Sequence, residues 1–279
     1  MPTADDLGRI VAFLAAFARR QAATVVEVPG GAVVLDPAYA GSHVDNQLVI
    51  DATAAALTDG AFDPAALPLL AEDVLGGLAH RRITVLDDAV GRACAPALTA
   101  AGYEQEVELL MAYTGPPVPA PVPAAEAVTL AELRPALLPQ LRVWMPQAPT
   151  AVLEQLADRR TARLRGADQV RFLAVRDQEG TIGASADLYV DGRGTAQIEE
   201  IVTADTHTRR GYADTILATA LHRTAGCSLV FLVADPDGWP HTWYARRGFT
   251  AVGRSHVFSR TPSAAAAEPS SGPGRVASV

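Results

Sequence analysis

The chain has 279 residues, of which 49% are hydrophobic, so it is long enough for two globular domains with a core each. Its formal net charge is −8, and it has no basic stripe with interleaved aromatic residues, which argues against a nucleic-acid-binding protein. The two cysteines, Cys94 and Cys227, form no disulfide framework, and we expect a reducing, cytoplasmic location. No apolar run approaches the roughly 18 uncharged residues of a membrane span.

Charge and proline content divide the chain into parts. Residues 1–113 carry 15 acidic and 6 basic side chains, whereas residues 126–261 carry 15 and 16. Between them, GPPVPAPVPAA (115–125) alternates prolines, which predicts an extended, semi-rigid spacer. After Thr261 the sequence is of low complexity and predicts a disordered tail. The predicted parts are a first domain (1–113), a linker (114–126), a second domain (127–261) and the tail (262–279).

Hydrophobic periodicity predicts the elements in chain order. IVAFLAAFARRQAA (10–23) predicts an amphipathic surface helix, because its apolar residues recur at helical spacing. From residue 127 the predicted order is β-α-α-β-β-β-α-β-α-β, with Thr150 as the N-cap of the second helix. The expected strands lie at 127–130, 170–176, 181–190, 195–203 and 228–234, with one or two more in 249–260. The expected helices lie at 131–143, 150–164, 211–225 and 239–247.

Two segments have the same succession of features. Residues 83–103 and residues 229–249 each contain an apolar strand, an acidic turn, a helix, and a glycine followed by an aromatic residue. Each is followed by another strand-like run. We interpret this as an internal repeat, although the same succession could recur by chance.

TRRGYA (208–213) lies between a predicted strand and a predicted helix. The small residues Gly211 and Ala213 allow a tight turn, and the free amides of the helix start form an anion site. Arg209 and Arg210 add positive charge, which suits a pyrophosphate. The segment is neither a Walker loop nor a GxGxxG fingerprint. Considered alone, it could also be a solvated basic turn.

YARRGF (244–249) follows a buried strand and the acidic turn ADPDGWP (234–240). Considered alone, Tyr244 reads as a core aromatic, and the glycine as the end of a helix. The full order of strand, TRRGYA, helix, strand, acidic turn and YARRGF resembles the Gcn5-related N-acetyltransferase (GNAT) superfamily. This resemblance covers residues 128–260.

The resemblance implies an α/β (α+β) fold in which helices flank a mixed central sheet. The first half resembles a second, degenerate copy, because HRRITVLDD (80–88) and LTAAGYEQEVELLMAY (98–113) are similar to its closing elements. It lacks the glycine-containing loop, so we expect no CoA there. The expected architecture is therefore two tandem GNAT-like domains, similar to that of the mycothiol synthases.

In this family the motif Arg/Gln-x-x-Gly-x-Gly/Ala binds the pyrophosphate of acetyl-CoA. It falls here on Thr208, Gly211 and Ala213, so the first position departs from the pattern. Asp237 stands where the family has an asparagine; it could cap the next helix or contact the pantetheine arm. The residues implied to bind the cofactor are Ile201, Val202, Thr203, Thr208, Arg209, Arg210, Gly211, Tyr212, Ala213 and Asp237.

The resemblance also implies direct attack of an amine on the thioester. Tyr244 would protonate the departing thiolate, a role that suits a phenol with a pKa near 10. Alternatively, Tyr244 only packs or hydrogen-bonds the sulfur. A backbone amide within residues 201–203 would stabilise the carbonyl oxygen.

The general base is expected on the strand TAQIEEIVT (195–203). Some family members carry a catalytic glutamate at the position of Gln197, and Glu199 is the nearest carboxylate expected on that face. The alternative role for Glu199 is to orient the amine or a water. Strict alternation predicts Glu200 on one face and, on the other, Gln197, Glu199, Ile201 and Thr203. On the preceding strand, Asp187 and Tyr189 could also face the substrate.

We therefore predict an N-acetyltransferase that moves the acetyl group of acetyl-CoA to a primary amine of a small molecule or peptide. The alternative is an acetyl-CoA-binding sensor or regulatory module without turnover. The six histidines form no HxH or HExxH pair, so no metal is expected. We expect no nucleic acid and no membrane as partners, and leave a homodimer open. The acidic first half favours a cationic amine.

Overall fold

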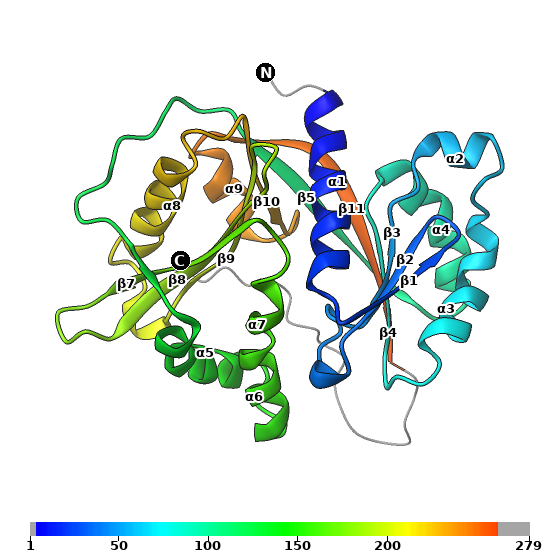
Figure 1. Cartoon of the computed structure of the whole chain (residues 1–279), viewed down its shortest axis with the longest axis horizontal. Coiled ribbons are helices and arrows are strands. Elements are labelled where there is room, and N and C mark those ends of the chain that lie inside the picture. Colours follow the sequence, from blue (N-terminus) through cyan, green and yellow to red (C-terminus); the bar gives the residue numbers. More distant parts are fainter. Residues whose placement is uncertain (1–3, 262–279) are drawn as a thin grey trace.

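The computed structural model describes residues 4–261; the tail predicted for residues 262–279 lies outside them. Within that range the strands form one mixed sheet, in the order β1-β2-β3-β4-β11-β5-β10-β9-β8-β7-β6, with helices packed on it (Figure 1). The strands are β1 (Thr24–Val28), β2 (Gly31–Leu35), β3 (Gln47–Ile50), β4 (Arg81–Val85), β5 (Glu104–Tyr113), β6 (Glu126–Val128), β7 (Gln169–Arg176), β8 (Ile182–Val190), β9 (Thr195–Thr203), β10 (Leu229–Ala234) and β11 (Phe249–Arg260). The helices are α1 (Ala4–Gln21), α2 (Ala54–Thr58), α3 (Leu67–Leu75), α4 (Asp88–Ala100), α5 (Leu130–Trp144), α6 (Thr150–Asp158), α7 (Arg160–Arg163), α8 (Tyr212–Arg223) and α9 (Trp239–Ala245).

The element order predicted for residues 127–261 is confirmed, with one added break. The single helix expected at 150–164 is divided at Arg159 into α6 and α7. Its N-cap is Pro149, without a side-chain hydrogen bond, so the predicted capping role of Thr150 is wrong. Residues 249–260 form one long strand.

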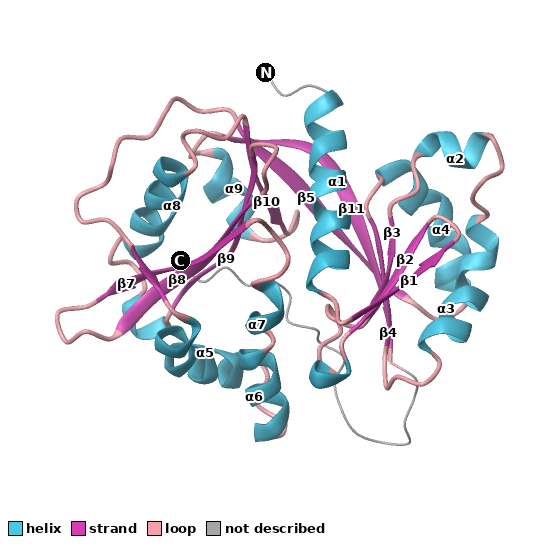
Figure 2. Ribbon diagram, viewed as in Figure 1, coloured by secondary structure: helices cyan, strands magenta, loops and turns pink. Residues whose placement is uncertain are grey.

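The two halves of the chain exchange their final strands (Figure 2). β5 from the first half lies between β10 and β11 and is antiparallel to both, with Met111 opposite Leu232 and Ala251. β11 from the second half continues to β4, where Phe258 lies opposite Ile83. Met111 therefore belongs to the core under α8, and Phe258 to the core under α3 and α4. Neither core is complete without a strand from the other half.

The repeated segments adopt the same structure. One forms β4, α4 and β5, and the other forms β10, α9 and β11. After each helix a glycine takes a left-handed conformation, with φ of +84° at Gly102 and +92° at Gly248. In each segment the helix returns the chain, so the final strand runs in the same direction as the strand before the helix and enters the middle of the sheet, with one antiparallel strand between them.

Helix α1 covers the region where the halves meet, in contact with β2, β5, β9 and β11. It buries Ile10 and Phe13, and the Phe13 ring meets the edge of Phe231 at 5.3 Å. Arg9 donates to the hydroxyls of Ser228 at 2.8 Å and Thr195 at 3.1 Å, next to the starts of β10 and β9. The predicted amphipathic helix is thus present and fixes the first half to the second.

The ring of His43, in the loop between β2 and β3, stacks on that of His80, which directly precedes β4. The rings of His43 and His80 lie 3.8 Å apart, and His80 Nε2 contacts the carbonyl oxygen of Asn46 at 2.9 Å. Burial, with the nearby charges of His80 and Arg82, lowers the pKa of His43 to about 4. His43 is therefore neutral in the folded protein at pH 5, where an unfolded histidine is protonated.

The histidine pair should make stability sensitive to mild acid. Between pH 6.5 and 4 the unfolded chain binds a proton at His43 that the folded chain does not, so the free energy of unfolding should fall by about 3 kcal/mol at most. In His43→Gln, the free energy of unfolding measured with urea should differ less between pH 7 and pH 4.5 than in the wild type. His222→Gln, at an exposed position, serves as the control. Equal pH dependence in both variants would contradict the assignment.

Strand exchange should also prevent residues 114–279 from folding alone. Without β5, the fragment exposes the apolar edges of β10 and β11, and we expect aggregation or loss of strand signal in circular dichroism. Co-expression with residues 1–113 should restore a soluble complex. Cleaving the intact protein within residues 115–125 is the control and should leave the halves associated. A monomeric, folded 114–279 fragment would refute the need for β5.

Candidate functional site

β9 and β10 diverge and leave a gap in the sheet. They pair in parallel only where Leu229–Phe231 lie beside Thr195–Gln197. β9 then runs on to Thr203, while the rest of β10 pairs on its other side with β5. The last part of β9 therefore has one backbone edge without a neighbouring strand.

The corresponding strands of the first half remain together. β3 and β4 pair as far as Ile50 and Val85, and the amide of Leu86 still donates to the carbonyl of Ile50 at 2.9 Å. The first half thus has no equivalent gap between its parallel strands.

A β-bulge interrupts β9 at Glu200, which has a left-handed φ of +49°. Asp187 on β8 lies opposite Glu199, but Ser185 lies opposite Val202, so β9 contains one extra residue. The predicted alternation beyond Glu199 is therefore wrong. Ile201 packs in the core on the α8 face of the sheet, and Thr203 lies opposite Ala184 of that same core.

The bulge also decides which backbone amides face the gap. The amide of Ala204 donates to the carbonyl of Gly183 on β8 at 2.9 Å. Because amide direction alternates along a strand, those of Ile201 and Thr203 point away from β8 and toward the gap, whereas that of Val202 points to β8. The Thr203 hydroxyl is buried and has no hydrogen-bond partner among the described residues.

The loop before α8 is open to solvent and positively charged. Arg209 has a φ of +60° and, like Arg210, is exposed. Gly211 is the N-cap, with a φ of +77° and empty space where a Cβ would lie, and no side chain caps the amides that follow. Thr208, at the position that departs from the family motif, uses its hydroxyl within the loop, donating to Asp205 O at 3.1 Å.

His207 fixes this loop to the turn between β7 and β8. Its Nε2 lies 2.9 Å from the Asp177 carboxylate, and its ring stacks on Tyr212 at 5.9 Å. Both rings cover Gly183, where an added Cβ would lie 2.6 Å from the Tyr212 ring. The His207 contact, with backbone hydrogen bonds in the turn, lowers the pKa of Asp177. This role of His207 was not predictable from the sequence, because its partner Asp177 lies in a separate turn.

Beside the loop lies a surface cavity of about 300 Å³. Its lining residues are Asp177, Gln178, Glu179, Arg210 and Tyr212. The cavity therefore has the start of α8 on one side and an acidic turn on the other.

The predicted acid and base lie on different faces of the sheet. Tyr244 is 6% exposed and shares the α8-side core with Ile201 and Ala213; its ring is 5.8 Å from that of Phe249. Glu199, also 6% exposed, lies on the other face, where Gln197 Nε2 donates to its carboxylate at 2.6 Å.

Two further predicted roles differ from the structure. Asp237 is exposed and does not cap α9, because Gly238 is the N-cap and no side chain bonds there. Asp187 and Tyr189 are 1% and 2% exposed, and Asp187 Oδ2 accepts from Tyr189 Oη at 2.8 Å. Both are thus enclosed in a polar network beneath α7, away from the protein surface.

Within residues 4–261, no group of three or more histidine, cysteine, aspartate or glutamate side chains is arranged to hold a metal ion. In the same range, no helix combines the length and apolar composition needed to cross a membrane.

No protein-family model and no curated protein matches the chain, whereas solved structures do. It is similar to a GCN5-related N-acetyltransferase from Kribbella flavida, with a TM-score of 0.62 and 17% identity over 92% of this chain and 96% of that one. It is also similar to a functionally unknown conserved protein from Staphylococcus epidermidis ATCC 12228, with a TM-score of 0.57 and 13% identity over 85% and 92%. Both similarities extend over both halves, and with the diverging β9 and β10 they show that the chain has the fold of the GCN5-related N-acetyltransferases, in a tandem arrangement.

Proposed function

We propose that the protein transfers the acetyl group of acetyl-CoA to a primary amine of a small molecule or peptide. One observation carries the proposal: the unpaired end of β9, with amides facing the gap, is followed directly in the chain by the arginine-flanked start of α8. A ligand with an extended amide-containing arm and a pyrophosphate fits this combination.

The residues on both parts of the site fit such a ligand. Arg209, Arg210 and the amides of Gly211–Ala213 would hold the pyrophosphate, since the α8 start offers donors and positive charge. The amide of Thr203 would pair with the amide-containing arm, which leaves that of Ile201 for the thioester. The unpartnered Thr203 hydroxyl supports this fit, because a buried polar group without a partner is costly.

Acetyl-CoA supplies the acyl group in activated form, as a thioester. Glu199 would take a proton from the substrate ammonium, directly or through a water, so that the free amine attacks the thioester carbon, with Gln197 holding the Glu199 carboxylate in place. The Ile201 amide would donate to the carbonyl oxygen as negative charge develops there. Tyr244 would give a proton to the departing sulfur as the C–N bond forms and the C–S bond breaks.

A second candidate is an acetyl-CoA-binding sensor without turnover. The burial of both Tyr244 and Glu199, each 6% exposed, favours it, because a closed site binds without admitting an acceptor. Calorimetry with acetyl-CoA and a CoA-release assay on an amine panel distinguish the two. Binding without release would support the sensor, and release with at least one amine the enzyme.

Reversing the charge at Arg210 should weaken acetyl-CoA binding. Arg210→Glu places a carboxylate at the pyrophosphate position, and we expect the Kd from calorimetry to rise at least about tenfold, or about 1.4 kcal/mol. Arg193→Glu, an exposed arginine in the turn between β8 and β9, is the matched control. Equal affinities for acetyl-CoA in both variants would support the alternative interpretation of TRRGYA as a solvated basic turn.

Removing the Tyr244 hydroxyl should slow turnover while preserving binding. In Tyr244→Phe we expect kcat to fall about 10²- to 10⁴-fold, the usual range for a lost acid, with the Kd for acetyl-CoA unchanged. Tyr113→Phe is the control: its ring also packs on Phe249, at 5.3 Å, and its hydroxyl donates to Pro116 O. An unchanged kcat in Tyr244→Phe would leave this tyrosine with a packing role.

A further inference from the structure

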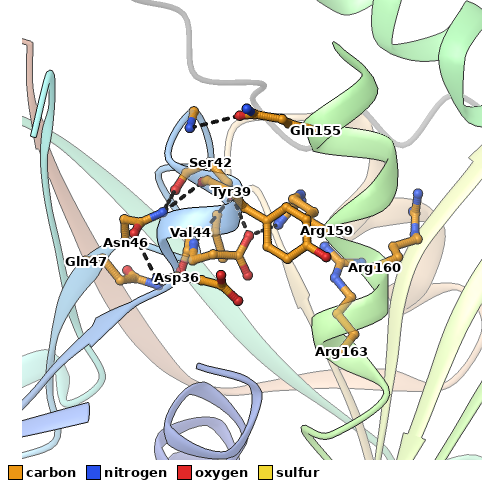
Figure 3. A network of polar contacts seen from close by, with 12 residues as sticks. Asp36, Tyr39, Ser42, Val44, Asn46, Gln47, Gln155, Arg159, Arg160 and Arg163 are labelled. Carbon is orange, nitrogen blue, oxygen red and sulfur yellow. Dashed lines mark hydrogen bonds and ion pairs between the residues drawn. The ribbon is translucent and has the colours of Figure 1, made fainter. Parts of the chain in front are cut away.

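A cluster of three arginines lies against the β9 bulge. Arg159, Arg160 and Arg163 come from the junction of α6 and α7, next to the loop that precedes β3 (Figure 3). The side chains of Arg160 and Arg163 are each only 7% exposed. Buried guanidinium groups need carboxylate partners, and these partners belong to β8, β9 and the first half.

Glu200, the left-handed residue of the bulge, binds all three arginines. Its carboxylate accepts from Arg163 at 2.6 Å and from Arg159 at 3.4 Å, and it also pairs with Arg160. The expectation that Glu200 faces away from Glu199 is therefore wrong. The bulge turns its side chain to the α7 face of the sheet, where Asp187 and Glu199 also lie.

Asp187 on β8 is a second carboxylate partner for two of these arginines, Arg160 and Arg163. Its Oδ2 accepts from Arg163 at 2.6 Å and from Arg160 at 3.2 Å. Because Asp187 lies opposite Glu199, directly before the bulge, the two arginines bind both strands around the extra residue. We call Arg160, Arg163, Asp187 and Glu200 the bulge clamp.

Glu200 is not suited to act as a base. Burial by itself raises the pKa of this carboxyl, but the charges of Arg160, Arg163 and Arg159 outweigh burial and hold it well below the usual range. The group is therefore ionised at neutral pH and does not take up a proton there. Its contribution is to hold the backbone in place.

The bulge needs such a hold, because a left-handed φ is unfavourable for a residue that has a Cβ. If Glu200 relaxed to an extended conformation, the chain beyond it would rotate. The amides of Ile201 and Thr203 would then turn away from the gap between β9 and β10.

The first half of the chain reaches this cluster through Asp45. Its carboxylate lies 3.3 Å from Arg159 and also accepts from the Ser42 hydroxyl. In the same loop, the Gly41 amide donates to Gln155 at 3.4 Å (Figure 3). One arginine therefore bridges the acidic first half and the bulge.

We propose that Glu200 is a positioning residue: the bulge clamp, joined to Asp45 through Arg159, holds the Ile201 and Thr203 amides toward the gap. The proposal rests on the proposed function for the use of these amides in acyl transfer. The proposal also gives the first half a role in the site. That half has no gap of its own, but its Asp45 contact helps to stabilise the bulge that orients these amides.

The test compares Glu200→Gln, which keeps the size of the side chain and removes its charge, with Asp158→Asn. Asp158 forms the surface ion pair with Arg134 on the same helical layer and does not touch the bulge, so this variant is the control. For Glu200→Gln we expect kcat to fall ten- to hundredfold, while the acetyl-CoA Kd rises by a smaller factor, because the α8 start that would hold the pyrophosphate is separate from the bulge. Positioning errors of about 1 Å have effects of this size on kcat.

Amide hydrogen exchange of the ligand-free protein gives a readout independent of turnover. In Glu200→Gln, the segment 198–204 should exchange at least about tenfold faster, since loosening of the bulge frees the ladder to β8, while the segment 229–234 remains unchanged. Unchanged exchange in 198–204 overturns the proposal. A loss of acetyl-CoA affinity equal to the loss of kcat also overturns it. If wild-type protein releases no CoA, the proposed function fails, and exchange alone decides on the clamp.

Asp45→Asn covers the case in which Glu200→Gln does not fold. This variant leaves the pairs of Glu200 with Arg160 and Arg163 and removes only the link to the first half. We expect faster exchange in 198–204 and a kcat reduced about three- to tenfold. Exchange and kcat equal to those of Asp158→Asn would exclude a contribution from the first half.

Discussion

The pairing of β5 with β10 on one edge and β11 on the other determines the rest of the structure. β10 can diverge from β9 because its other edge is bonded to β5, so the gap opens without leaving β10 as a free strand. The same strand brings Met111 into the core that holds Tyr244 and Ile201. A strand that belongs to the first half in sequence thus supports β10 and the core beside the gap in the second.

The halves share one plan but differ at the feature on which chemistry depends. In the first half, β3 and β4 pair to their ends and the segment between them forms α2 and α3. In the second, the bulge at Glu200 and the open loop at Gly211 produce a gap that leads to a charged helix start. The first half contributes β5, α1 and the Asp45 contact to the shared structure.

Local features were predictable from the sequence because each depends on nearby residues. The apolar runs mark the strands, the small residues of TRRGYA mark the turn into α8, and Gly248 ends α9. The bulge was not predictable, since Glu200 and Arg209 adopt positive φ without being glycine, and only ion pairs formed in the folded protein stabilise Glu200 there. The exchange of β5 and β11 was not predictable either. The apolar pattern of a strand is the same whether its neighbour comes from its own half or from the other half. Because strict alternation does not include the bulge, it predicted the wrong face of the sheet for Ile201, Thr203 and Glu200.

The position of β5 also governs when the chain can fold during synthesis. β5 ends at Tyr113, but its partners begin at Leu229 and Phe249, so more than half of the chain must leave the ribosome before its edges are covered. Contacts between residues so far apart in sequence form slowly and leave apolar strand edges exposed until they do. The interlocked sheet thus leaves β5 of the newly made first half without its partner strands until the second half has been synthesised, whereas two separate domains would fold one after the other.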